Sequence, residues 1–250
     1  MDHGTGQDAE SVTGGGELLV VLGVGPGLGM SMAERFGAEG HDLALVSRST
    51  ARHPSYRARL AERGIGSRTY AADVNDPEDL HRVLAEIRAA QGPVGAAWFG
   101  PASTEGPAIV PLPDAGPEAL LAPVRALLAP LPHVVRELVP DMVARGRGTL
   151  FFGVGGSGLV PTPALGTLAP ASAAARMYVL TLAETLGEKG VHVAALTIGG
   201  VIARGDIHRS LAAQPGLLDA FGTLDPDDIA AAAWELHRER DRHELVFGGA

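Results

Sequence analysis

Short apolar runs alternate along the chain with longer segments in which apolar residues recur every three to four positions. The runs fall at residues 18–24, 42–46, 67–72, 94–99, 149–154, 191–197 and 243–247. The helical patterns fall at residues 28–38, 55–63, 77–90, 118–145, 169–188, 207–213 and 226–240. Strands of a parallel sheet that is covered on both faces read as continuous apolar runs. The order therefore predicts an α/β fold, a single doubly wound parallel sheet over residues 17–250.

Two segments depart from this alternation. Residues 1–16 are polar and glycine-rich, which predicts a disordered tail. Residues 118–145 have a helical composition but contain four prolines, and proline inside a helix kinks or breaks it. We expect two helices there, or one interrupted helix.

The first apolar run ends in a glycine cluster that passes directly into a helical pattern. Gly23, Gly27 and Gly29 form a GxxxGxG spacing, and Gly25 and Leu28 lie in the same turn. The first turn of a helix has unpaired N–H groups and the positive end of the helix dipole, so it attracts anions. Glycine also lets a phosphate approach the backbone. The segment predicts a nucleotide phosphate site, and the alternative is an ordinary tight turn.

The end of the second run indicates the type of nucleotide. An acidic residue there would bind a ribose 2′-hydroxyl and repel a 2′-phosphate. This chain instead has Ser47, followed by Arg48 and Ser49, with Arg52 nearby. A guanidinium can hold phosphate oxygens through two hydrogen bonds. We therefore expect NADP(H) rather than NAD(H), and the alternative reading of Arg48 is a solvated surface arginine.

Composition limits the partners and the chemistry. The formal net charge of −9 argues against nucleic acid and anionic membranes. We see no apolar stretch of the ~18 residues that a membrane span needs, and no signal peptide. The absence of cysteine excludes disulfides and thiolate metal sites and fits a cytoplasmic protein. His237 and His243 are spaced like surface groups without a visible third ligand, so no metal site is expected.

The order of elements resembles the short-chain dehydrogenase/reductase family over nearly the whole chain from Glu17. The glycines of the phosphate turn match, and Asp73-Val74 matches the acidic residue that contacts adenine in the family. Residues 190–200 (GVHVAALTIGG) resemble the strand and turn behind the nicotinamide, with Gly199 in place of the usual proline. The resemblance implies a Rossmann-like fold and a dinucleotide site that includes Gly100.

The same resemblance implies that the catalytic residues of the family are missing. Family enzymes use a tyrosine and a lysine four residues apart, a serine and an asparagine. When Ala171-Ser172 is aligned with the usual Ala-Ser of the family, neither the tyrosine nor the lysine is present. The four catalytic positions are then occupied by Leu127, Gly155, Ala169 and Ala173.

The residue inventory agrees with this alignment. The only lysine, Lys189, lies at the far end of the helical pattern that begins at Ala169. The remaining candidates belong to the adenine half or lie off the relevant helix face: Asn75, Tyr56, Tyr70 and Tyr178. No shift of register restores the four residues.

Candidate substitutes are Ser157, Ser172 and Arg176. A hydroxyl is a poor proton donor without a partner base, and both serines are also typical of turns or helix packing. Arg176 lies two turns after Ala169 on the same helix face, where it is expected to stabilise an oxyanion or to form a salt bridge at an oligomer contact. Less direct candidates lie in the proline-rich helix or in an expected lid loop: His133, Arg204, Asp206 and His208.

Three classes of function stay open. The first is an NADP(H)-dependent oxidoreductase with a non-standard proton donor, acting on a small apolar carbonyl or enone. An apolar pocket is expected from the proline-rich loops 101–113 and 160–168, and Trp98 and Phe99 either form its wall or belong to the core. The second is a non-redox cyclase, isomerase or dehydratase, and the third is a non-catalytic nucleotide-binding or partner protein.

The family resemblance also implies an oligomer. In the family, the long helices after the fourth and fifth strands pack between subunits. Residues 169–186 are rich in alanine and leucine with few charges, which suits such a contact. We expect a homodimer or homotetramer.

Overall fold

A seven-stranded sheet lies at the centre of the computed structural model, which describes residues 16–101, 106–213, 216, 218 and 221–249. The strand order is β3-β2-β1-β4-β5-β6-β9, and all neighbouring strands run parallel. These strands are β1 (Leu18–Leu22), β2 (Asp42–Ser47), β3 (Arg68–Ala71), β4 (Val94–Phe99), β5 (Gly148–Gly155), β6 (Val191–Ile198) and β9 (Glu244–Phe247). The expected doubly wound fold is confirmed. The tail prediction falls, except for Gly16, outside the described residues.

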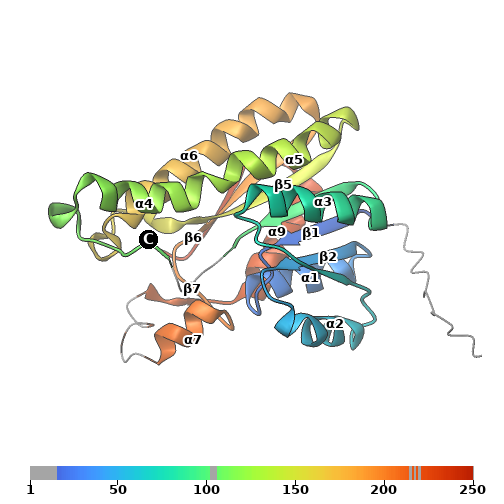
Figure 1. The fold of residues 1–250 in the computed structure, drawn as a ribbon, viewed down its shortest axis with the longest axis horizontal. Coiled ribbons are helices and arrows are strands. Elements are labelled where there is room, and N and C mark those ends of the chain that lie inside the picture. Colours follow the sequence, from blue (N-terminus) through green and yellow to red (C-terminus); the bar gives the residue numbers. More distant parts are fainter. Residues whose placement is uncertain (1–15, 102–105, 214–215, 217, 219–220, 250) are drawn as a thin grey trace, which may run out of the picture.

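Helices cover both faces of this sheet (Figure 1). One layer contains α3 (Pro77–Gln91), α5 (Pro130–Ala144) and α6 (Leu168–Leu186), and α4 (Pro117–Leu128) packs against α6. The other layer contains α1 (Leu28–Ala38), α2 (His53–Ala61) and α9 (Pro226–Glu239). Each layer has its own apolar core, so the sheet separates two cores.

Strand β1 shows why the strands read as continuous apolar runs. Leu18, Val20 and Leu22 belong to the core under α3, α5 and α6, whereas Leu19 and Val21 belong to the core under α1, α2 and α9. Successive side chains of a strand point to opposite faces, and here both faces are buried. A strand at the centre of this sheet therefore needs apolar residues at every position, without alternating polar ones.

The expected boundaries agree with the structure to within two residues, and those of α1 and β4 agree at both ends. Strand β1 ends earlier than expected because Gly23 has a φ of +90°, which takes the chain out of the extended conformation. The structure adds a short parallel pair, β7 (Val201–Ile202) with β8 (Thr223–Leu224), that the sequence did not predict. Strands of two residues are too short to show a hydrophobic period in the sequence.

The proline-rich region forms two consecutive helices, as expected. Pro130 lacks an N–H group and begins α5, while Pro123 and Pro140 lie inside α4 and α5. Taken together, Pro117–Ala144 contains a window of 18 residues with a mean hydropathy of 1.3, which by length and composition alone is enough to cross a membrane. The segment also contains charged residues such as Arg125, Arg136 and Glu137, so it is not an uninterrupted apolar run. Only 22% of its most apolar window is buried, which leaves much of this apolar surface exposed.

Candidate functional site

The carboxyl ends of β1 and β4 define the candidate site. These two strands are neighbours in the sheet, yet the chain leaves β1 toward β2 on one side and β4 toward β5 on the other. Such a reversal of strand order opens a crevice at the carboxyl ends of the strands, where ligands of doubly wound folds bind. The glycine turn between β1 and α1 lies at this point.

The glycine turn is tightly held at its base and open at its tip. A Cβ atom on Gly23 would lie 2.7 Å from Pro101 Cα, and one on Gly29 would lie 3.0 Å from Val24 Cα. A Cβ atom on Gly25, by contrast, would meet nothing within 4 Å. Glycine is thus required where the turn packs against the chain, and the backbone at Gly25 remains approachable.

The N-terminus of α1 fits an anion. Its N-cap residue is Gly27, no side chain caps it, and the first turn contains no acidic residue. The amide N–H groups of this turn and the dipole of an eleven-residue helix favour an anion that approaches at Gly25, since Gly27 itself packs against Ala203 and Gly205. Leu28, the first helical residue, is buried and anchors the helix to the core.

The loop after β2 is shaped by the residues expected to select the nucleotide. The Ser47 hydroxyl donates to the Ser49 carbonyl oxygen at 3.1 Å and lies 2.9 Å from His53 Nε2. The Ser49 hydroxyl accepts from the Ala51 N–H group at 3.2 Å. These contacts leave Arg48 on an exposed part of the loop. The buried His53, which the sequence analysis missed, orders this loop through Ser47.

Arg52, the second arginine of this loop, forms an ion pair with Asp206. Its two terminal nitrogens lie 2.7 and 2.9 Å from the Asp206 carboxylate, and this contact spans 154 residues of sequence. Hydrogen bonds from Arg52 and from Arg209 lower the pKa of Asp206. The pair joins the loop after β2 to the start of α7 (Asp206–Ala212). Sequence spacing gave no signal for this contact.

The connection between β7 and α7 passes over the glycine turn. A Cβ atom on Gly27 would lie 3.0 Å from the Ala203 carbonyl oxygen. Arg204 Nη2 lies 3.3 Å from Ser31 Oγ in α1, and it also pairs with Asp225 and Asp227 at the start of α9. The expected lid segment is therefore attached to the cofactor half in this structure. His208 follows in α7.

Asp73 and Val74 follow β3 at the same edge of the sheet. Asp73 is half-buried and its carboxylate accepts from the Asn75 N–H group at 3.0 Å, while Asp79 accepts from the Asp73 N–H group. Val74 is buried in the core. This arrangement gives the turn after β3 a defined shape with one carboxylate at its surface.

Gly199 and Gly100 close the crevice behind β6 and β4. The Gly199 N–H group donates to the Phe247 carbonyl oxygen at 2.7 Å, a bond that the proline usual in the family cannot form. A Cβ atom on Gly100 would lie 2.2 Å from the Trp98 ring. Trp98 and Phe99 are only 3% and 5% exposed and belong to the two cores, which fits their packing alternative rather than a wall facing the substrate.

Two hydroxyls lie together where β5 meets α6. Ser157 donates to Ser172 with an Oγ–Oγ distance of 3.2 Å, and Ser172 is buried. A Cβ atom on Gly155 would lie 2.7 Å from Ser172 Oγ, so a larger residue at this position would displace α6 or the Ser172 side chain. The structure thus brings Gly155, Ser157 and Ser172 together.

The other expected catalytic positions carry no polar side chain into this group. Ala169 is half-buried and Ala173 is exposed in the first turns of α6, and Leu127 lies partly exposed on α4. Lys189 lies beyond the opposite end of α6. His133 sits on α5, where its Nδ1 atom is 3.1 Å from Arg136.

Arg176 is not available as an oxyanion donor. Its Nε atom lies 2.7 Å from Glu244 Oε1 and its Nη2 atom 2.5 Å from Glu244 Oε2, and Thr197 also donates to this carboxylate. The pair is formed within the chain, and Nε and Nη2 of Arg176 are directed to the start of β9 rather than to the serine pair. Burial alone would raise the pKa of Glu244, but the hydrogen bonds from Arg176 and Thr197 lower it overall.

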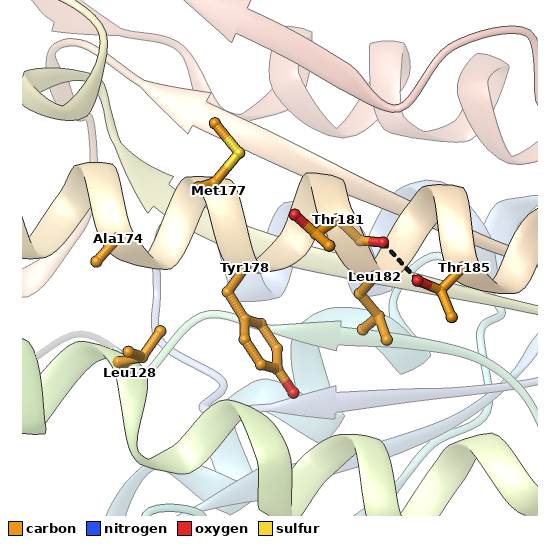
Figure 2. A pocket seen from close by; sticks show the side chains of 7 residues that line it. All are labelled: Leu128, Ala174, Met177, Tyr178, Thr181, Leu182 and Thr185. Carbon is orange, nitrogen blue, oxygen red and sulfur yellow. Dashed lines mark hydrogen bonds between the residues drawn. The ribbon is translucent and has the colours of Figure 1, made fainter.

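A groove of about 550 Å³ lies between α6 and the α4–α5 helices (Figure 2). Tyr178 extends from α6 toward the helix that carries Leu128, whereas Met177 projects from the opposite side of α6 (Figure 2). Burial raises the pKa of Tyr178. Tyr178 thus belongs to a surface groove rather than to the serine pair, which agrees with its expected displacement from the Ala169 face.

The class of protein follows from comparison with known families and structures. The family model for short chain dehydrogenases matches residues 17–213, so the chain belongs to that family. Two curated Mycobacterium tuberculosis proteins, both described as uncharacterized oxidoreductases, are 39% identical to the chain over 73 residues. That match covers 28% of this chain and 29% of each relative.

Solved structures show the same fold over nearly the whole chain. L-sorbose reductase from Gluconobacter frateurii, complexed with NADPH and L-sorbose, has a TM-score of 0.78 at 21% identity, covering 94% of this chain and 96% of that one. Gluconate 5-dehydrogenase from Burkholderia cenocepacia, in complex with NADP and tartrate, has a TM-score of 0.77 at 18% identity, covering 94% of both chains.

Replacing Glu244 by Gln is expected to destabilise the protein by about 1–3 kcal/mol at neutral pH, because a largely buried guanidinium loses its partner. The folded-state pKa of Glu244 lies below its usual value of 4.5, so the ion pair stabilises the fold fully above that pH and progressively less as pH falls through the folded pKa. Urea unfolding of both proteins across this range should therefore show a difference that shrinks toward low pH. A constant difference would contradict this assignment.

Proposed function

We propose that this protein is an NADP(H)-dependent oxidoreductase that acts on a small apolar carbonyl or enone without the usual tyrosine and lysine of its family. The observation that carries the proposal is the uncapped N-terminus of α1 beneath an open glycine turn, with Arg48 and Arg52 at the end of β2. The family membership supports redox chemistry, and the similar solved structures with bound NADP or NADPH support this cofactor.

Each part of the site has a role in this proposal. The N–H groups at the start of α1 bind the pyrophosphate, and Asp73 with Val74 borders the adenine. Arg48 and Arg52 bind the 2′-phosphate. The bound cofactor supplies or accepts the hydride. Gly100 and Gly199 line the crevice without side chains that would obstruct a flat ring.

The serine pair is the polar group nearest to the expected reaction centre. Ser157 is half-buried and its hydroxyl lies 3.2 Å from that of the buried Ser172, so Ser157 is the member of the pair that a substrate oxygen can reach. A serine hydroxyl without a base is too weak an acid to supply the proton itself. We therefore assign orientation of the carbonyl to the serine pair and proton delivery to water.

A non-redox reaction is the second candidate, and the absence of an acidic group from Gly155, Ala169 and Ala173 favours it. Glycine and alanine at these positions leave room to hold a substrate but cannot protonate it. The two candidates differ in one measurement, because redox turnover changes the nicotinamide absorbance and an isomerisation or dehydration does not. Incubation of the protein with a panel of apolar ketones, enones and alcohols, read by absorbance and by product analysis, separates them.

The exposed face of α4 and α6 supports a homo-oligomer. Leu121 and Leu127 of α4 are 43% and 36% exposed, and Met177 of α6, which lines the groove together with Tyr178, is 57% exposed. Contiguous apolar surface of this kind marks interaction sites. We propose that a second copy of the chain covers it.

Replacing Arg48 by Asp should weaken NADPH binding by about ten- to a hundredfold, because charge-assisted hydrogen bonds to the 2′-phosphate are lost and a repulsive charge is introduced. NADH binding should change little. Fluorescence titration with both nucleotides measures this, and Arg136→Asp on the exposed surface of α5 is the charge-matched control. Equal loss for both nucleotides, or no loss, would overturn the assignment.

Replacing Asp206 by Asn tests whether Arg52 is shared between the cofactor and α7. In the present structure Arg52 must leave its carboxylate partner before it can bind a phosphate. The variant should bind NADPH up to about fivefold more tightly, since an exposed ion pair contributes about 1 kcal/mol at most. NADH affinity is the internal control, and unchanged NADPH affinity would show that Arg52 does not reach the 2′-phosphate.

Replacing Met177 by Glu should dissociate the oligomer, because a charge is placed in a buried apolar contact. Light scattering after gel filtration gives the mass of each variant. Met177→Leu retains an apolar side chain and should leave the assembly intact. A monomeric unmodified protein at micromolar concentration would show that this face has no second copy as its partner.

A further inference from the structure

A group of three metal-ligating side chains lies at the amino end of the sheet, opposite the glycine turn. Glu17 directly precedes β1, His41 directly precedes β2, and His237 lies in the last turn of α9. One ligand atom from each residue lies within 4.8 Å of the other two. The topology thus joins residues from three separate parts of the chain.

His237 is not the surface group that the sequence spacing indicated. Its side chain is only 10% exposed, and its Nδ1 atom lies 3.0 Å from the Oγ1 atom of the fully buried Thr149. The other ring nitrogen, Nε2, lies 3.9 Å from Glu17 Oε2. A histidine whose Nδ1–H group donates to a neighbour presents a lone pair on Nε2, which is the arrangement found in metal-binding histidines.

His41 carries a polar atom that the protein leaves unused. Its Nε2 atom is buried and has no hydrogen-bond partner among the described residues. The ring packs edge-on against Phe36 and Trp234, with centroid distances of 5.3 and 5.4 Å, and lies 5.5 Å from the His237 ring. An unsatisfied buried nitrogen is costly, so each such atom calls for an explanation.

We propose that Glu17, His41 and His237 bind a zinc-like transition-metal ion. Two imidazoles and one carboxylate are borderline ligands that suit Zn²⁺ better than Mg²⁺ or Ca²⁺. Ligand atoms at ~2.1 Å from a tetrahedral ion lie roughly 3.4 Å apart. Glu17 Oε2 and His237 Nε2, at 3.9 Å, need to approach by about half an ångström, and no pair in the group, all within 4.8 Å, needs more than about 1.5 Å. Thr149 orients His237, and water completes the coordination.

The surroundings of Glu17 allow this. Its side chain is 33% exposed, which provides an entry path for the ion. The competing contact is Arg147, whose Nη1 atom lies 3.8 Å from Glu17 Oε1 and whose side chain is 62% exposed. An exposed pair at this distance is weak and is easily displaced by a divalent cation.

The bound ion would be structural rather than catalytic. It lies at the opposite end of the strands from the glycine turn and ties the last turn of α9 to the starts of β1 and β2. A ligand that binds only the folded state stabilises it. Metal binding at this group does not depend on the proposed redox function.

The test uses untagged, chelator-treated protein with His3 replaced by Gln, so that no histidine near the amino terminus binds the metal. Calorimetric titration with Zn²⁺ should show one equivalent bound with a micromolar or tighter Kd, and Zn²⁺ should raise Tm. His41→Gln and His237→Gln should each weaken binding at least about tenfold. His81→Gln is the matched control, because His81 is an exposed histidine beside Glu137 on other elements.

A spectroscopic measurement keeps the proposal falsifiable if a histidine variant fails to fold. Co²⁺ bound by the unsubstituted site should give the intense visible absorption of tetrahedral coordination. The proposal is overturned if the parent protein shows no Zn²⁺-dependent heat or Tm rise, if Co²⁺ retains the weak spectrum of the hydrated ion, or if His41→Gln binds Zn²⁺ as tightly as the parent.

Discussion

The close approach of the backbone at the end of β1 is the constraint on which the rest of the site depends. Gly23 takes a positive φ and lies so near Pro101 that no side chain fits. Its N–H group and that of Val24 both donate to the Val46 carbonyl oxygen, at 3.0 and 2.8 Å. These bonds hold the turn against β2. The turn therefore sets the direction of α1, whose N-terminus lies at the crevice between β1 and β4. The position and direction of the α1 N-terminus therefore follow from backbone geometry alone.

Ion pairs and hydrogen bonds between distant segments determine which residues surround the glycine turn. The Arg52–Asp206 pair and the Arg204 contacts attach the β7–α7 segment to the loop after β2 and to α1. The guanidinium groups of Arg52 and Arg204 thus link the loop after β2, the β7–α7 segment and α1. Some polar residues that the sequence offers as site candidates form ion pairs within the chain instead, as Arg176 does with Glu244.

The two ends of the sheet carry different chemistry. The carboxyl end presents backbone N–H groups, two arginines and a pair of serine hydroxyls. The amino end presents Glu17, His41 and His237 next to buried aromatic rings. Strand β1 connects the two ends directly. Glu17, just before this strand, and the glycine turn, just after it, therefore lie at opposite ends of the sheet.

The sequence by itself determined the fold class, the boundaries of most helices and strands, and the position of the glycine turn. These depend on local hydrophobic period, glycine conformation and helix starts, all of which act within a few residues. It also offered Ser157 and Ser172 as candidate site residues, and the structure places their hydroxyls 3.2 Å apart. Only the tertiary structure decided the partners of Arg52 and Arg176, the burial of His237 and the pairing of β7 with β8. Each of these joins residues far apart in the chain, and contacts of that kind leave no period or spacing in the sequence.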